Sequence, residues 1–163
     1  LKGSEIEVRP EALNEGESRF VTDLRAYHDA HPDEFKDREL YLLRNRSRGH
    51  GVGFFEAGNF HPDFILWLVT GDYQTIIFVD PKGIHHLSPD DPKIVFHKTI
   101  KEIEERMKDR KTRLEAFIIS RTPAHEMEKK WGIKKAEMLK RHILFQDDGA
   151  EECIGALMEA AGK

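Results

Sequence analysis

The chain has 163 residues, which suits one domain whose core is large enough to need no disulfide or structural metal. Hydrophobic residues make up 39% of the chain and charged residues 34%, and no stretch approaches the roughly 18 consecutive apolar residues of a membrane span. The single cysteine excludes a disulfide framework within the chain and leaves the compartment reducing or undetermined. We therefore expect a cytoplasmic protein without membrane association.

The net charge of −4 hides a segregation of charge along the chain. Residues 93–141 carry 15 basic and 8 acidic side chains, whereas residues 1–43 carry 6 basic and 11 acidic ones. Phosphate binding depends on local charge rather than on the total. The basic excess is therefore either a solvated helix face, which is the common case, or a surface that faces DNA.

The first third of the chain predicts one helix and two strands. Residues 14–31 repeat apolar side chains at helical spacing, with Asn14 as the capping residue and a proline after the last turn. Residues 39–45 and 52–56 are predicted strands, separated by a basic loop that contains glycine. The chain does not begin with methionine, so we expect a single domain, residues 1–163, of a longer polypeptide; processing would explain the same fact.

Two apolar runs, residues 64–69 and 75–79, flank a break at Gly71 and predict an antiparallel hairpin. After the hairpin, the patterns predict a helix, a strand, a helix, a short strand and a terminal helix capped by an aspartate, with residues 133–139 ambiguous. These elements cover residues 92–111, 114–120, 123–131, 141–146 and 147–161. The alternation predicts an α/β fold with a mixed central sheet flanked by helices.

Three polar residues are predicted to meet at one end of this hairpin. Asp63 precedes the first strand and Asp80 ends the second, and in an antiparallel pair these two positions are neighbours. Lys82 shares a face with Asp80 if extended structure continues, because side chains alternate along a strand. The commoner interpretation of each residue alone is a turn or cap aspartate and an ordinary surface lysine.

This combination of residues suits phosphodiester hydrolysis. Mg²⁺ or Mn²⁺ neutralises the phosphate and activates water, and such hard cations prefer carboxylate and carbonyl oxygens. Asp63, Asp80 and the backbone carbonyl of Pro81 are the predicted metal ligands, and Lys82 would lie beside the attacking water. Because proline fits poorly within a central strand, we expect the chain to leave the sheet at Pro81.

The arrangement of Pro62-Asp63, a hairpin and then Asp80-Pro81-Lys82 resembles the PD-(D/E)xK motif of the restriction-endonuclease-like nucleases. The resemblance implies that family's αβββαβ core and an Mg²⁺-dependent or Mn²⁺-dependent nuclease activity. It also implies a further acidic residue on the first helix, for which Glu17 is the candidate, with Glu15 and Asp23 behind it. Glu17 could instead only complement the dipole of its own helix. Many members have Glu or another residue where this chain has Asp80-Pro81, which puts a second metal site in doubt.

A narrower resemblance is to the C-terminal nuclease domains of type III, helicase-like restriction subunits, carried by residues 44–45, 51–56, 61–68 and 79–83. It implies DNA as the substrate, a helicase or translocase domain in the same polypeptide, and a possible homodimer. Three arginines precede the site on the basic loop and either contact DNA or remain solvated: Arg44, Arg46 and Arg48.

Two alternative interpretations are a protein without catalytic activity and a site that binds zinc. A non-catalytic DNA-binding or partner-docking module of a helicase-like protein would keep the same fold without the chemistry. Zinc is disfavoured because the nine histidines and one cysteine show no Cys-x-x-Cys or His-x-x-x-His spacing.

Overall fold

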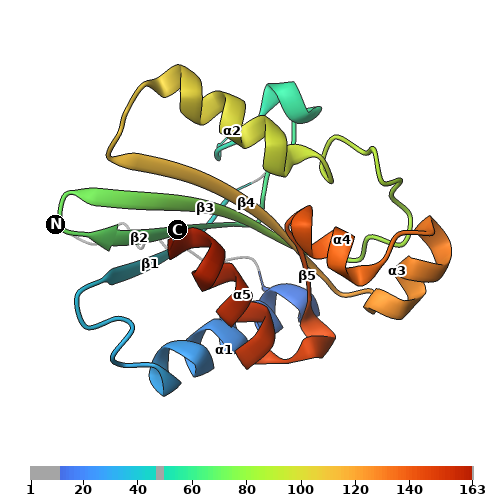
Figure 1. Cartoon of the computed structure of the whole chain (residues 1–163), viewed down its shortest axis with the longest axis horizontal. Helices are drawn as coiled ribbons and strands as arrows, with labels where there is room; N and C mark the ends of the chain where they lie inside the picture. Colours follow the sequence, from blue (N-terminus) through green and yellow to red (C-terminus); the bar gives the residue numbers. More distant parts are fainter. Residues whose placement is uncertain (1–11, 47–49, 163) are drawn as a thin grey trace, which may run out of the picture.

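The computed structural model describes residues 12–46 and 50–162 and shows an α/β fold with a five-stranded mixed sheet flanked by helices (Figure 1). The strands are β1 (Glu39–Arg44), β2 (Phe64–Thr70), β3 (Tyr73–Lys82), β4 (Thr112–Ser120) and β5 (Ile143–Phe145). The helices are α1 (Glu15–Ala30), α2 (Phe96–Met107), α3 (Ala124–Trp131), α4 (Lys135–Lys140) and α5 (Ala150–Gly162). Two short 3₁₀ helices are η1 (Phe55–Ala57) and η2 (Gln146–Asp148). The predicted α/β fold class, with a mixed central sheet flanked by helices, is confirmed.

The strands lie in the sheet in chain order, β1-β2-β3-β4-β5. β1 pairs antiparallel with β2 and β2 pairs antiparallel with β3, whereas β3, β4 and β5 pair in parallel. The predicted hairpin is therefore present as β2 and β3, with Phe64 paired to Val79 and Thr70 paired to Tyr73. Its strands are longer than the apolar runs alone indicated.

Helix α1 begins at the predicted residue because its first turn is capped. The Asn14 side chain accepts a hydrogen bond from the Glu17 amide at 2.9 Å, and the Glu17 carboxylate accepts one from the Asn14 amide at 3.0 Å. This reciprocal capping box satisfies two of the amides that a helix start leaves without partners. It also fixes the position of the Glu17 side chain.

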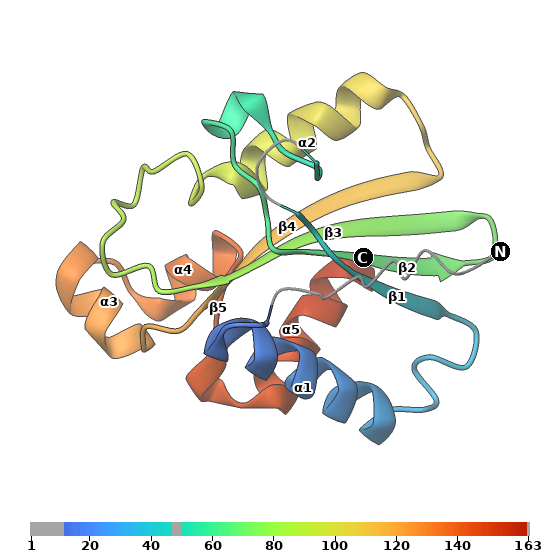
Figure 2. The same ribbon diagram turned by 180° about the vertical axis from the view of Figure 1, so that it is seen from behind.

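Helices cover both faces of the sheet, with α2 on one side and α1 and α5 on the other (Figure 2). The side chains of the strands alternate between these two faces. Leu66 and Ile77, both fully buried, pack in the cluster that includes α1 and α5. Their neighbours Ile65 and Phe78 pack in the cluster that includes α2. Within the described part of the chain, none of the helices has the length and apolarity to cross a bilayer.

The predicted strand at residues 52–56 is wrong. Only one bridge, between Phe54 and Phe60, occurs there, and the chain turns through η1 to Gly58, which has a left-handed conformation with φ of 66°. The Phe54 ring packs on Phe78 and Phe96, with ring centroids 4.8 and 4.6 Å away. Phe54 therefore covers the α2 face of the sheet, whereas Val52 and Phe55 are exposed and no strand forms.

Two predicted helix limits also differ. The helix expected over residues 92–111 is the shorter α2, because the chain turns before Phe96 and Lys108 has a left-handed conformation with φ of 54°. The terminal helix is not capped by an aspartate. Asp148 belongs to η2 and accepts a hydrogen bond from Lys135 Nζ at 2.8 Å, and α5 starts after Gly149.

Candidate functional site

The structure brings Asp63 and Asp80 together at the end of the β2–β3 hairpin. The register that pairs Phe64 with Val79 places Asp63, one residue before β2, opposite Asp80. The Asp80 side chain points to the face that carries Phe78, because residues two apart in a strand share a face, and the Asp63 side chain hydrogen-bonds to Asp80. Lys82 lies on the same face, two residues after Asp80. The predicted convergence of these three residues is therefore observed.

The Asp80 carboxylate is buried and incompletely satisfied. Asp80 is 2% exposed, and among the described residues its Oδ2 atom has no hydrogen-bond partner. The Lys82 ammonium contacts the same oxygen as an ion pair, but the two groups are not oriented as a hydrogen bond. This ammonium is itself a cation at the oxygen, so it offsets part of the cost of burying the carboxylate.

The surroundings of Asp63 raise the pKa of its carboxyl group strongly. Burial raises the pKa of Asp63 to about 8, assisted by the negative charge of Asp80, by a hydrogen bond with Asp80 and by the charge of Glu17; Lys82 opposes the shift. In the absence of a bound cation, the raised pKa therefore favours a proton shared between the side chains of Asp63 and Asp80. A divalent cation would have to displace this proton to bind both side chains.

The chain does not leave the sheet at Pro81, so that prediction is wrong. Pro81 and Lys82 continue β3 and pair with β4. Lys82 O accepts a hydrogen bond from Arg121 N at 2.9 Å, so the Lys82 backbone faces β4. The backbone groups of Pro81 then face the β2 side of β3. Because the pairing of β2 with β3 ends at Phe64 and Val79, no residue of β2 requires an N–H from Pro81. Its carbonyl oxygen points toward the side on which Asp63 lies.

Glu17 both caps α1 and approaches the carboxylate pair. Its side chain is 8% exposed and accepts a hydrogen bond from Arg44 Nη2 at 3.0 Å. Its negative charge is one of the causes that raise the pKa of Asp63. Glu17 is therefore close enough to influence the site electrostatically, while Arg44 and the helix cap hold its carboxylate.

The three arginines that precede the site have different surroundings, since Arg44 ends β1 and the other two follow it. Arg44 contacts Glu17 and also donates to Ala12 O at 3.4 Å. Arg46 is exposed, and Arg48 lies outside the described residues. Contact of these arginines with DNA stays a prediction.

No role was predicted for Asn45 from the sequence, yet its hydrogen bonds fix the segment that carries Asp63. Its side chain donates to Pro62 O at 2.8 Å and to Val52 O at 2.7 Å, and accepts from Val52 N at 2.9 Å. The backbone N–H of Asn45 donates to Asp63 O at 2.7 Å. An asparagine directly after a strand and before a glycine-containing loop was the available signal.

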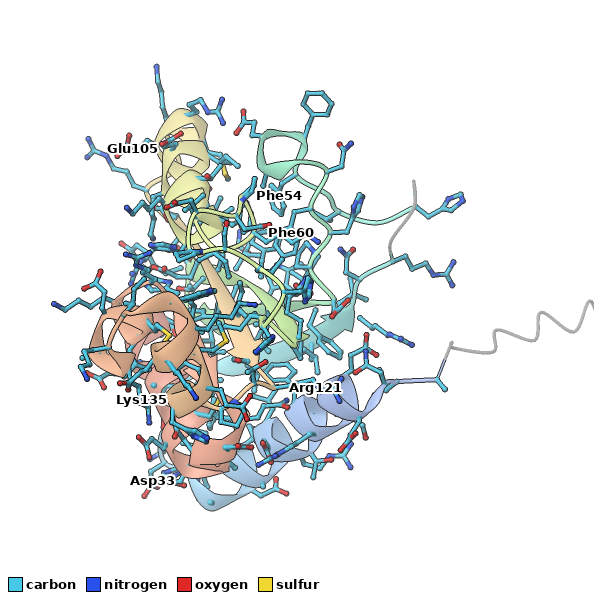
Figure 3. All side chains as sticks on the ribbon, turned by 90° about the vertical axis from the view of Figure 1, so that its right-hand side faces the viewer. Asp33, Phe54, Phe60, Glu105, Arg121 and Lys135 are labelled. Carbon is cyan, nitrogen blue, oxygen red and sulfur yellow. The ribbon has the colours of Figure 1, made fainter. Side chains whose placement is uncertain are left out.

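Phe60 forms a wall of the site and was also missed. Its ring is 4% exposed, and Lys82 Nζ lies 5.3 Å from the ring centroid, within the range of a cation–π contact. Figure 3 looks onto this end of the molecule and labels Phe60 and Arg121. Lys82 is thus held between Asp80 and an aromatic ring.

The residues present fit a hard divalent cation that needs few protein ligands. Across residues 12–46 and 50–162, no group of three or more His, Cys, Asp and Glu side chains is arranged to hold a metal ion. Mg²⁺ usually takes one or two carboxylates and keeps several waters. Asp63, Asp80 and the Pro81 carbonyl would supply such oxygens, and a cation bound there would compete with the Lys82 ammonium for Asp80.

Comparison with known proteins does not identify a family. No protein-family model, no curated protein and no solved structure matches the chain.

Proposed function

We propose that this domain is a deoxyribonuclease that hydrolyses DNA phosphodiester bonds with Mg²⁺ or Mn²⁺. The observation that carries the proposal is the convergence of two carboxylates, Asp63 and the buried Asp80, with the ammonium of Lys82 at the end of one hairpin. The resemblance to PD-(D/E)xK nucleases supports it. The same resemblance is the basis for proposing DNA as the partner, a helicase or translocase domain in the same polypeptide, and a restriction or helicase–nuclease system as the context.

Each residue of the site has a distinct task in this proposal. Asp63, Asp80 and the Pro81 carbonyl hold the cation, which when bound neutralises phosphate charge and lowers the pKa of water. Lys82 donates hydrogen bonds to the attacking water and to the phosphate oxygens, where negative charge accumulates in the transition state. Phe60 and Asp80 keep the Lys82 ammonium in place. Arg44 fixes Glu17 beside Asp63.

A second candidate is a non-catalytic DNA-binding or partner-docking module. One observation favours it: Lys82 already pairs with Asp80, so the carboxylate has a cationic neighbour without any metal. In that case the polar cluster would only stabilise the end of the sheet. Cleavage assays distinguish the two candidates.

The test is cleavage of plasmid and single-stranded DNA in the presence of Mg²⁺ or Mn²⁺. We expect the wild-type protein to cleave only with the cation, and Asp80→Ala to reduce the rate by at least about 100-fold, because a metal ligand is lost. Asp72→Ala is the matched control, since Asp72 lies at the opposite end of the same hairpin and its side chain is 82% exposed. Equal behaviour of wild type and Asp80→Ala across metals and substrates would make the nuclease proposal wrong.

A further inference from the structure

Arg121 is the residue directly after β4, and its backbone is fixed beside the end of β3. Its amide donates to Lys82 O at 2.9 Å. The preceding Ser120 pairs with Lys82 in the sheet, and its hydroxyl donates to Thr122 O at 2.7 Å and accepts from Thr122 N at 3.1 Å. These hydrogen bonds close a tight turn around Arg121. The turn fixes the direction in which its side chain leaves the sheet.

The Arg121 side chain crosses the first turn of α1 and packs directly over Gly16. A Cβ atom at Gly16 would lie 2.5 Å from Arg121 Cδ, which is closer than non-bonded carbon atoms approach. The guanidinium reaches Glu15, with Nη2 3.4 Å from Oε2. Figure 3 shows Arg121 next to the start of α1. Glu17, which influences Asp63, lies on the same helical turn.

Two arginines therefore contact the first turn of α1, and their ion pairs differ in exposure. In the Arg44–Glu17 pair the side chains are 29% and 8% exposed, and the closest atoms are 3.0 Å apart. In the Arg121–Glu15 pair they are 42% and 89% exposed, and the distance is 3.4 Å. Exposed ion pairs contribute little stability and exchange readily with solvent and solutes. Arg121 can consequently leave Glu15 at little cost, whereas Arg44 is held more firmly.

We propose that Arg121 is a phosphate-binding residue for the DNA strand that enters the site, and that Glu15 occupies its guanidinium when DNA is absent. The inference rests on the proposed nuclease function. A cluster of carboxylates repels DNA, and Arg121, whose amide donates to Lys82 O, adds a positive charge near this cluster that attracts the phosphates. An arginine suits this task because its planar guanidinium forms two parallel hydrogen bonds with a phosphate.

The test is the affinity for a fluorescently labelled DNA oligonucleotide, measured by anisotropy with Ca²⁺ in place of Mg²⁺. Arg121→Ala should weaken binding about tenfold or more, and the slope of log affinity against log salt concentration should fall by about 0.7–0.9, the value for one phosphate contact. Arg121→Lys should restore part of the affinity. Glu15→Gln should strengthen binding, because it removes the competing charge. If the Arg121–Glu15 pair had only a structural role, Arg121→Ala and Glu15→Gln would not change the DNA affinity in opposite directions.

Arg106→Ala is the matched control, since Arg106 forms an exposed pair with Glu56 at 2.7 Å on another part of the surface. It should bind DNA like wild type. The inference is wrong if Arg121→Ala binds DNA as tightly as wild type, or if Glu15→Gln weakens binding. If wild type cleaves DNA and Arg121→Ala binds normally, only this inference fails. If wild type binds through Arg121 but never cleaves with Mg²⁺ or Mn²⁺, only the catalytic proposal fails, and if wild type neither binds nor cleaves, both fail.

Discussion

Replacing Lys82 by alanine is expected to reduce the rate of metal-dependent DNA cleavage by about 100- to 1,000-fold, the effect of removing one preorganised donor to developing negative charge. The Lys82 ammonium is held by Asp80 and by the Phe60 ring, so its position does not depend on substrate. Single-turnover rates at saturating Mg²⁺ or Mn²⁺ measure the chemical step directly. Cleavage by Lys82→Ala at the wild-type rate would contradict the assigned role.

The same variant separates chemistry from metal binding. Lys82→Ala removes the cationic neighbour of Asp80, so the carboxylate should bind a divalent cation at least as tightly as in wild type. A variant that retains the metal and loses cleavage would identify Lys82 as a group acting on the reacting atoms. Lys111→Ala is the control, because Lys111 is exposed and pairs with Asp72 at the opposite end of the sheet. Its cleavage rate should equal that of wild type.

Replacing Asp63 by asparagine is expected to stabilise the protein at alkaline pH when no divalent cation is present. The pKa of Asp63 is about 8 in the folded protein, well above the value of about 3.9 for an unfolded chain. The folded state therefore favours the protonated form, and this contribution to stability is full below pH of about 4 and is lost as the pH rises through 8. Asparagine cannot ionise, so residue 63 of Asp63→Asn causes no loss of folding stability as the pH rises.

Thermal unfolding with a chelator at pH 5, 7 and 9 measures this effect. The melting temperature of Asp63→Asn minus that of wild type should increase with pH, because all other titrating groups are common to both proteins. With Mn²⁺ added at pH 9, wild type should gain more stability than the variant, since only wild type keeps both carboxylates. An equal difference in melting temperature at all three pH values would show that ionisation of Asp63 does not destabilise the folded protein. Asp72→Asn, at an exposed position, should follow wild type.

The parts of the fold that were predictable depend on local signals. The alternation of apolar side chains around Gly71 determines both strands of the hairpin, and the antiparallel register then places Asp63 opposite Asp80. Asn14 marks the start of α1 because its side chain satisfies a free amide of the first turn. These relations involve residues close in sequence, so the positions of the two site carboxylates could be inferred before the structure was known.

The parts that were missed depend on contacts between distant segments. The continuation of β3 through Pro81 follows from pairing with β4, which decides the side that each backbone amide faces. The location of Arg121 over Gly16 depends on how the end of β4 meets α1. Asn45 links Val52 to Pro62 across a loop whose residues 47–49 lie outside the described chain. Sequence patterns contain no direct signal for such packing.

Calorimetric titration with Mn²⁺ tests the central claim most directly, because it examines the carboxylate pair without DNA or any other domain. At pH 8 we expect wild type to bind the cation at the site of Asp63 and Asp80, with release of the Asp63 proton. Asp80→Asn should lose this binding, whereas Asp72→Asn should retain it. Absence of binding by wild type, or equal binding by wild type and Asp80→Asn, would contradict the assignment of these residues as a metal-dependent nuclease centre.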